Sequence, residues 1–288
     1  MAAFFSKSYL FSGDGGVISI QTESHTLSII SSMFYNCTCS NHGGAIYFYS
    51  SNSSLKMICA NTCSCGTDRV GNFAWIQASH LNIMQYLSVS YCSYTSLGYY
   101  STMISAGFQN VGNINCSMNK GNIYGAGICY STSSNSSSSY CTFSDNKVNN
   151  GVSINIYQTS GTMIYTNIVN NNTPSLSSSN YGTIYKNGGG AYIMNNCIFD
   201  NNQNTLFSVR EGFLEVSYSF ISHTGKLSKL TPVSIAKNNS LTKTLTYQIQ
   251  FFKSHYCNAD IPNSLNTQIN YALRSFLPFI DLAILILT

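Results

Sequence analysis

The chain has 288 residues, of which 44% are hydrophobic and only 8% are charged, and its formal net charge is +4. Its 13 Lys and Arg residues form no cluster, which argues against nucleic acid as a partner because phosphate binding needs a concentrated basic stripe. The 21 Tyr, the 16 Phe and the many Ile exclude the aromatic-poor composition of a disordered chain, and the low Pro content favours strands.

The main organising feature of the chain is a repeat of roughly 26 residues. Each unit opens with a Gly-bounded apolar strand, which is clearest as Gly-Gly-Ala-Ile-Tyr-Phe at residues 43–48. A second strand follows and ends in a Cys or aromatic residue and an Asn, as in the Cys-x-Phe-x-x-Asn segments at 141–146 and 197–202. A fixed period in this range predicts stacked supersecondary units with an elongated surface, and not a compact pocket enzyme.

In chain order, we expect an N-terminal extension at residues 1–14, a repeat domain at 15–236 and a C-terminal cap or tail at 237–288. Ser-rich runs at 131–139 and 175–180 are interpreted as loops that project from the stack. Many strand segments alternate apolar with polar residues, as half-buried strands do. First strands are expected at residues 15–20, 43–48, 71–76, 102–105, 125–130, 151–156, 182–185, 206–209 and 233–235. Second strands are expected at residues 27–30, 81–84, 87–89, 163–165, 192–194 and 213–216.

These units are too small to bury an apolar side alone, so they are expected to coil and stack. Parallel pairing between successive coils would satisfy the backbone and would align Ile, Val, Phe and Cys in continuous internal columns. Gly at the strand starts permits the positive φ of sharp corners, and stacked Asn side chains can pair amide to amide. We therefore predict an all-β fold, a right-handed parallel β-helix of about eight or nine coils with a non-repeat C-terminal segment.

The 11 Cys residues are too many for a typical cytosolic enzyme. The two Cys-x-Cys pairs at 37–39 and 63–65 are too tightly spaced for ordinary zinc ligation, so no metal site is predicted. The Cys residues are interpreted as small apolar core residues. We expect Cys116, Cys141 and Cys197 to stack in one column, and stacked neighbours would suit disulfides in an exported chain.

The targeting signals leave several alternatives open. Residues 1–13 are a poor signal peptide because Ser and Lys7 interrupt the apolar run. The apolar stretch at residues 276–287 is shorter than the about 20 residues of a spanning helix. A terminal cap strand, a truncated membrane anchor and a lipid-anchor signal all fit it. Asn-x-Ser/Thr sequons, which permit glycosylation of a secreted form, begin at Asn36, Asn52, Asn115, Asn135, Asn171 and Asn238.

Two motifs resemble those of a known family. The Gly-Gly-Ala-Ile-Tyr sequence at residues 43–47 is similar to the Gly-Gly-Ala-Ile/Leu/Val motif of polymorphic membrane proteins. Phe143 with Asn146, and Phe199 with Asn202, match the Phe-x-x-Asn motif that accompanies it. The resemblance implies a parallel β-helix.

The general residue pattern of the chain is similar to that of Cys-, Ser- and Asn-rich β-helix surface proteins of parasitic protists. It is visible at residues 34–37, 58–63 and 86–92, and the resemblance as a whole covers about residues 15–235. Members of these families are mostly surface or adhesion proteins, so the resemblance implies display at a cell surface.

Parallel β-helices also include polysaccharide lyases and hydrolases, so the fold alone does not decide between binding and catalysis. Hydrolysis of a glycosidic bond needs two carboxylates, and the best pair is Asp145 and Asp200, which we expect at one repeat position two coils apart. A lyase needs a base near acidic residues, and the candidates are the Asp-Arg pair at 68–69 and the Arg-Glu pair at 210–211. Each candidate is more simply a corner or surface residue, and no nucleophile motif accompanies the separate His25, His42, His80, His223 and His255.

We therefore predict a non-catalytic cell-surface or secreted β-solenoid that presents an extended face for adhesion or interaction. Its expected partner is a host or cell-surface protein or glycan, with no nucleic acid, no metal and no cofactor, and its C-terminus is a candidate for membrane association. Uncharged Tyr, Ser and Asn residues suit such contacts, as they do in adaptable binding loops. One alternative is a polysaccharide-active β-helix with a degenerate lyase-like or hydrolase-like site, and another is a non-functional fragment of a larger surface protein.

Overall fold

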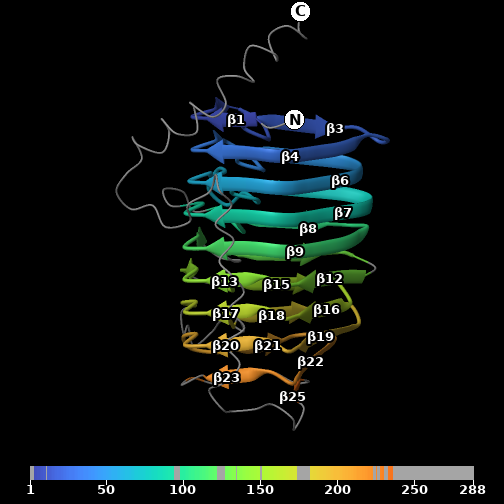
Figure 1. The fold of residues 1–288 in the computed structure, drawn as a ribbon, viewed down its shortest axis with the longest axis vertical. Helices are drawn as coiled ribbons and strands as arrows, with labels where there is room; N and C mark the ends of the chain where they lie inside the picture. Colours follow the sequence, from blue (N-terminus) through green and yellow to red (C-terminus); the bar gives the residue numbers. More distant parts are fainter. Residues whose placement is uncertain are drawn as a thin grey trace, which may run out of the picture.

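The computed structural model describes residues 3–10, 12–93, 98–121, 127–133, 135–149, 151–173, 182–222, 225, 228–229 and 233–235. Over these residues the chain is all-β, without a helix, and forms a parallel β-solenoid of about seven turns (Figure 1). The predicted fold class is confirmed. The expected C-terminal cap or tail at residues 237–288 lies outside the described part of the chain.

Each turn runs through three parallel faces, which the long strand β7 (Ala74–Ser90) shows in one piece. Its residues 74–78 lie in the first face, 81–85 in the second and 87–90 in the third, and all of them pair in register with β6 (Ile46–Asn61). The sequence repeat of two strands therefore corresponds to three structural faces, because the second and third strands are separated by a single corner residue.

The other strands fall into the same three faces and mostly pair with the turns before and after them. The first face contains β3 (Ile18–Gln21), β8 (Thr102–Ser105), β11 (Ile128–Ser131), β15 (Ile154–Tyr157), β18 (Ile184–Asn187), β21 (Phe207–Val209) and β24 (Ser228–Lys229). The second face contains β12 (Asn135–Ser139), β16 (Gly161–Ile164), β19 (Ala191–Asn195), β22 (Phe213–Ser217) and β25 (Val233–Ile235). The third face contains β1 (Ala3–Ser6), β13 (Thr142–Ser144), β17 (Asn167–Val169), β20 (Ile198–Asp200) and β23 (Phe220–Ser222).

Four more short strands and two long ones complete the stack. The second and third faces also contain β4 (Thr26–Tyr35) and β9 (Phe108–Ser117). Two small sheets pair β2 (Tyr9–Leu10) with β5 (Thr38–Cys39), and β10 (Lys120–Gly121) with β14 (Lys147–Val148). Residues 1–14, expected as an extension, therefore contribute β1 and β2 to the stack.

The expected number of coils, eight or nine, is slightly too high. The position of the faint strand at residues 233–235, which we expect in the first face, is also wrong. Instead, β25 pairs with β22 in the second face, and β24 supplies the first-face strand of that turn. A short apolar run shows that a strand exists but does not show which face it occupies.

The Ser-rich run at residues 131–139 is not a projecting loop, contrary to expectation. It contains β12, which pairs with β9 on one side and β16 on the other. Ser136 and Ser138 are buried, and Tyr130 Oη donates a hydrogen bond to Ser138 Oγ at 3.1 Å. Ser is therefore tolerated inside the stack because a hydroxyl partner is present. The second Ser-rich run, at 175–180, lies outside the described residues.

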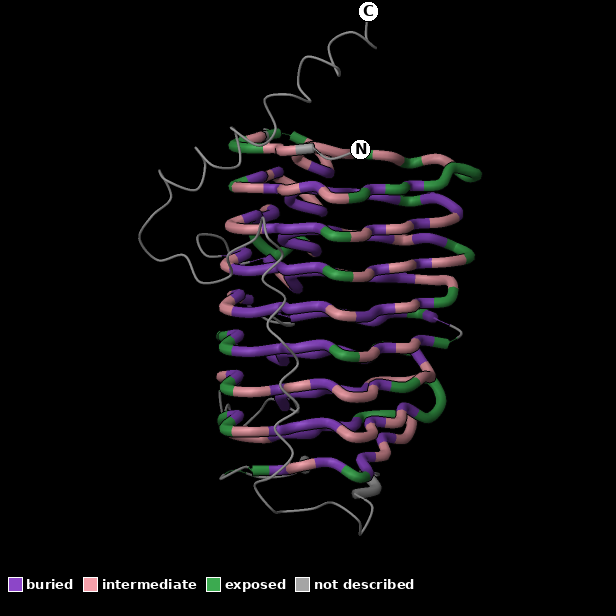
Figure 2. The backbone as a smooth tube through the Cα atoms, in the orientation of Figure 1, coloured by how far each residue is buried: buried purple, intermediate pink, exposed green. Residues whose placement is uncertain are grey.

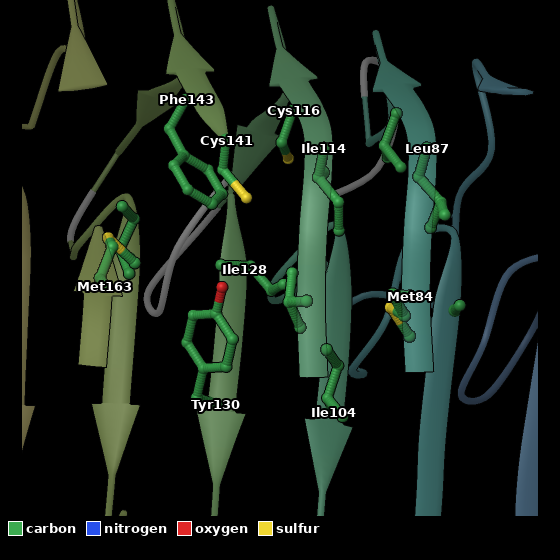
Figure 3. Packing of buried hydrophobic residues seen from close by; sticks show 14 of the residues in the cluster. Met84, Leu87, Ile104, Ile114, Cys116, Ile128, Tyr130, Cys141, Phe143 and Met163 are labelled. Carbon is green, nitrogen blue, oxygen red and sulfur yellow. The ribbon is translucent and has the colours of Figure 1, made fainter. Parts of the chain in front are cut away.

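The core is a continuous set of apolar columns along the axis of the stack. Leu87, Ile114 and Cys141 lie next to one another on successive strands of the third-face side, as Figure 3 shows. Tyr130 and Phe143 are fully buried beside them. Burying a side chain of this size contributes about 1.5–3 kcal/mol. Because the neighbouring turns provide this burial, each turn depends on them for its stability.

Glycines form the sharp corner before the first face in three successive turns. Gly15, Gly43 and Gly71 have φ of 68°, 67° and 81°, as the prediction of positive-φ Gly corners requires. A Cβ on Gly43 would lie 2.1 Å from the Ile46 carbonyl oxygen, so a larger residue does not fit there.

An asparagine ladder, defined as Asn119, Asn146, Asn171 and Asn202, follows the third face and is almost completely buried. Asn146 Nδ2 donates to Asn171 Oδ1 at 3.0 Å, and Asn171 Nδ2 donates to Asn202 Oδ1 at 2.9 Å. Each amide also donates to a backbone carbonyl, as Asn146 does to Cys116 O at 2.9 Å. The predicted amide-to-amide stacking is confirmed, and it satisfies the buried corner backbone.

Candidate binding surface

One corner of the solenoid carries a column of residues in the left-handed backbone conformation. These residues lie between the second and third faces, one per turn, at positions that the strand pairing aligns from β4 to β22. Their φ values lie between 48° and 60°. We call this column the tyrosine ridge, and it comprises Ser31, Met57, Tyr86, Asn113, Tyr140, Tyr165, Asn196 and Tyr218.

Large side chains of the ridge are exposed to solvent. The exposed fraction is 49% for Met57, 44% for Tyr86, 48% for Tyr140 and 55% for Tyr218. Exposed segments recur one above another on the front of the stack in Figure 2. Tyr140 stacks on Tyr165 of the next turn, with ring centroids 5.2 Å apart and an interplanar angle of 13°. Four of the eight ridge residues are therefore tyrosines, of which Tyr86, Tyr140 and Tyr218 are exposed and Tyr165 is half-buried against Tyr140.

The choice of Tyr at these corners is unfavourable for the backbone. A left-handed conformation costs an L-residue with a Cβ about 1–2 kcal/mol, while Gly and Asn adopt it readily. A second left-handed column follows the third face, and there short polar residues such as Asn36, Asp145, Asn170 and Asn201 predominate. Because backbone conformation does not explain the tyrosines, their exposed side chains are candidates for a function.

The surroundings of the ridge are polar but almost uncharged. None of the eight ridge positions holds Asp, Glu, Lys, Arg or His. The second-face positions that precede them contain one charged residue, Lys56, beside hydroxyl and amide residues such as Gln85, Ser139 and Asn195. On the outer side of the second face, Ser28 and Thr162 are exposed, and the column of Thr162 also contains the half-buried acidic residue Glu215. This surface therefore offers hydrogen bonds and ring contacts with few charged groups.

The expected carboxylate pair is not aligned. Asp200 pairs with Val169, which pairs with Ser144, so Asp145 lies one column further along the chain. The expectation was wrong because Asp145 is the fourth residue after its Cys, whereas Asp200 is the third. Asp145 is an exposed corner residue with φ of 55°, and Asp200 is half-buried in β20.

The two charged pairs considered for a lyase lie at exposed positions. Arg210 and Glu211 are exposed after β21, and Arg69 and Asp68 are exposed before the first-face part of β7. Asp68 Oδ1 accepts a hydrogen bond from Tyr99 Oη at 3.2 Å. These positions fit the simpler interpretation of surface residues.

His42, treated as separate in the sequence, is held in a polar and aromatic cluster. Its backbone N–H donates to Asp14 Oδ1 at 2.8 Å, its Nδ1 accepts from the Val70 N–H at 3.1 Å, and its ring lies 5.1 Å from Trp75. Burial lowers the pKa of His42, which Asp14 partly opposes. The signal for this cluster was present, since Asp14, His42 and Val70 each precede a corner Gly by one residue. The His42 side chain therefore accepts the hydrogen bond of a backbone N–H group at the corner, that of Val70.

Nine of the described cysteines are free, buried core residues, as interpreted, and Cys59 is disulfide-bonded, but one expected column is wrong. Cys141 and Cys197 share a column, whereas Cys116 pairs with Phe143 and so lies two residues further along the strand. The two Cys-x-Cys pairs stack on each other, because Thr38 bridges to Ser64. Among the described residues, no group of three or more Cys, His, Asp or Glu side chains is arranged to hold a metal ion.

Buried thiols replace the asparagine ladder in the earlier turns. The corner column that contains Asn119 continues through Cys92, Cys63 and Cys37, and the Cys92 N–H donates to Asn119 Oδ1 at 2.9 Å. These thiols are free and buried, and burial raises the pKa of Cys63. The Cys63 thiol is therefore protonated at neutral pH.

The sequons differ in accessibility. Asn36 and Asn135 are exposed, and Asn52 is half-buried. Asn115 and Asn171 are 3% and 0% exposed, and Asn171 belongs to the asparagine ladder. The sixth sequon lies outside the described residues. The folded chain therefore presents two fully accessible acceptor sites among those described.

Lys186 is a buried residue that sequence reasoning missed. It lies in β18 in register with Ile156 and Val209, its side chain is 0% exposed, and its Nζ donates to the Gly188 carbonyl. Burial lowers its pKa to about 8. Strand alternation after Ile184 is the signal that predicts an inward side chain at this position.

Comparison with known proteins finds no matching family model, no matching curated protein and no matching solved structure. The resemblance to polymorphic membrane proteins and to protist surface proteins therefore has no support beyond its motifs. Within the described ranges, the structure also contains no helix with the length and apolar character to span a membrane.

Proposed function

We propose that this chain is a non-catalytic β-solenoid, displayed at a cell surface or secreted, that presents an extended face for adhesion or interaction. The observation that carries the proposal is the tyrosine ridge, where exposed Tyr86, Tyr140 and Tyr218 recur at corners that are unfavourable for the Tyr backbone. Tyr and Asn side chains form contacts at low entropic cost, which suits a rigid recognition surface.

The shape of the scaffold supports the same proposal. Stacked turns hold the corner residues in a fixed line, so an extended partner can contact several turns at once. The accessible sequons at Asn36 and Asn135 are compatible with an exported chain. The expected partner is a protein or glycan on a cell surface.

Surface biotinylation of intact source cells, followed by glycosidase treatment of the recovered protein, tests the location. We expect labelling and a mass shift, and an unlabelled chain would contradict surface display. Purified chain should also bind cells, and the double substitution Tyr140→Asn/Tyr165→Asn should weaken this binding. Tyr91→Asn is the matched control, because Tyr91 has a similar φ of 54° but lies in the left-handed column that follows the third face.

A further inference from the structure

The outer side of the third face is more deeply buried than the outside of a solenoid should be. Core residues such as Leu87, Ile114 and Phe143 alternate along these strands with side chains that point outward. In the middle turns, these outward side chains have exposed fractions of only 0–5%, and they are Ser88, Ser90, Asn115, Ser117, Thr142 and Ser144. On the outer second face, Ser54 and Ser137 are equally small but only half-buried. Small size therefore does not account for the burial, and another part of the chain covers the third face.

Two of these outward residues indicate that the cover is polar. The Asn115 Oδ1 and Nδ2 atoms and the Ser88 Oγ atom are buried without a hydrogen-bond partner within the described part of the chain. Buried amides and hydroxyls are nearly always hydrogen-bonded, so the segment that excludes water here should bring polar groups of its own. Every described strand has its place in the three faces or the two small sheets, so the cover is a segment outside them.

A disulfide identifies this segment. Cys59 of β6 belongs to the same outward column, since it pairs with Ser88, which pairs with Asn115. Cys59 is disulfide-bonded, whereas the other nine described cysteines are free. The chain has 11 Cys residues, so the one that remains as the partner of Cys59 is Cys257.

We propose that Cys59 is bonded to Cys257, and that residues 236–257 form a polar strap along the outer side of the third face. The third-face strands follow one another along the axis of the stack (Figure 1). Seven strand spacings separate β25 from β6, which is about 34 Å at about 4.8 Å each. The chain from Ile235 to Cys257 reaches about 70 Å when extended, so it is long enough for this path. The path passes β13, β9 and β7, whose outward side chains are the buried ones.

The composition of the strap suits the surface that it would cover. Residues 238–250 are rich in Asn, Ser, Thr and Gln and contain one charged residue, Lys243. The buried outward residues of the third face are uncharged as well. Hydroxyl and amide groups of the strap provide both donors and acceptors for Ser88 and Asn115. A partner of the solenoid could then not bind on this part of the third face.

Formation of the bond requires an oxidant. The two thiols lose two electrons and two protons, which a disulfide such as oxidised glutathione accepts as it is reduced to two thiols. Protein disulfides persist in oxidising compartments, so this inference shares the exported location with the proposed function. It does not depend on the tyrosine ridge, so the two can fail separately.

Disulfide mapping of the full chain, secreted from eukaryotic cells with an added leader, tests the bond. Free thiols are blocked in denaturant, and monomer from a non-reducing gel is digested with trypsin without reduction. We expect residues 57–69 joined to residues 254–274, with fragmentation that places the bond at Cys59 and not at Cys63 or Cys65. A blocked Cys59 thiol, a bond from Cys59 to a different Cys, or a Cys59–Cys257 bond found only in a dimer would overturn the inference.

Labelling of introduced thiols with N-ethylmaleimide tests the cover, with each site quantified on its own peptide. Ser117→Cys, on the outer third face, should react at least about tenfold more slowly than the matched control Ser137→Cys, on the outer second face. Ser144→Cys gives a second measurement in the column of Ser117. Adding Cys257→Ser should accelerate labelling at position 117 and leave position 137 unchanged within about twofold.

Equal labelling rates at positions 117, 144 and 137 would show that the segment does not cover the third face, and would overturn the strap even where the bond is found. Neither failure changes the tests of the tyrosine ridge. Loss of cell binding in Tyr140→Asn/Tyr165→Asn would still support the proposed function, whereas retention of cell binding would contradict that function and leave the strap intact.

Discussion

Tyr140 and Tyr165 stack ring on ring at 5.2 Å although both occupy the left-handed conformation, with φ of 54° and 49°. The stack contributes about 0.5–1.5 kcal/mol, which is comparable to the backbone cost of one left-handed Tyr. Since both residues have this backbone cost, the stack offsets only part of the cost of the pair. Tyr218, the most exposed ridge residue, has the same backbone cost with 55% of its surface exposed.

Replacing Tyr218 by Asn should stabilise the fold. Asn adopts φ of 48° more readily than Tyr, so the free energy of unfolding should rise by about 0.5–1 kcal/mol. Tyr140→Asn should change it by less than about 0.5 kcal/mol, because the lost stack offsets the backbone gain. Urea denaturation with constant m-values measures both. A loss of more than about 1 kcal/mol for Tyr218→Asn would show that the ridge serves stability and would contradict its assignment to binding.

Replacing Asn146 by Ala should strongly destabilise the stack. Asn146 donates to Cys116 O and Asn171 Oδ1, and its Oδ1 accepts from Asn119 N and Nδ2 at 3.1 and 3.2 Å. Orphaned buried groups cost about 1–3 kcal/mol each, so we expect a loss of about 3–5 kcal/mol. The control is Asn170→Ala, at an exposed left-handed corner, which should cost about 1 kcal/mol. Equal losses in the two variants would mean that the ladder adds nothing beyond its corner conformation.

Replacing Gly43 by Ala should also destabilise the fold. The new Cβ would meet the Ile46 carbonyl oxygen at 2.1 Å, at a φ of 67°. We expect a loss of about 2–4 kcal/mol in thermal or urea unfolding. Gly112→Ala is the matched control, because its Cβ would meet nothing closer than 3.7 Å, and it should be neutral or slightly stabilising. A tolerated Gly43→Ala would show that this corner can rearrange.

Lys186 should make stability depend on pH in the alkaline range. Its pKa is about 8 in the folded chain, against 10.5 for an ordinary lysine, so between these values the unfolded chain binds more protons than the folded one. The contribution of Lys186 to the free energy of unfolding therefore rises as pH increases from about 8 to 10.5.

Lys186→Met should raise stability at neutral pH and should remove this part of the alkaline rise. Urea midpoints from pH 7 to pH 10.5 for the variant and the wild type measure the difference, because other groups that titrate there are common to both. Lys147→Met, at an exposed position, controls for the loss of one positive charge. Parallel pH curves for wild type and Lys186→Met would mean that the amine reaches solvent.

Glycosylation should follow the exposure of the sequons. In a chain secreted from eukaryotic cells with an added leader, we expect occupancy at Asn36 and Asn135 and none at Asn115 or Asn171, which the folded stack buries. Peptide mapping after enzymatic deglycosylation in heavy-oxygen water identifies the occupied sites. Modified Asn171 in natively folded protein would be incompatible with the asparagine ladder, whereas Asn146, which is not in a sequon, is an internal control for unmodified ladder residues.

Much of the fold could be predicted because the repeat carries its own physical signals. The Gly corners at 15, 43 and 71 and the Asn residues at 146 and 202 recur where a stack needs positive φ or a buried amide. The tyrosine ridge could not be predicted in the same way. Tyr140 and Tyr165 are 25 residues apart, and nothing in their local sequence shows that both occupy the same corner of successive turns.

The sequence by itself determined that strands stack in register, since a period of roughly 26 residues with apolar columns buries its core in no simpler way. Only the tertiary structure decided which residues share a column. The strand pairing places Asp145 one column beyond Asp200, and Cys116 two columns beyond Cys141. The same pairing placed the tyrosines on one exposed line and Lys186 in the core.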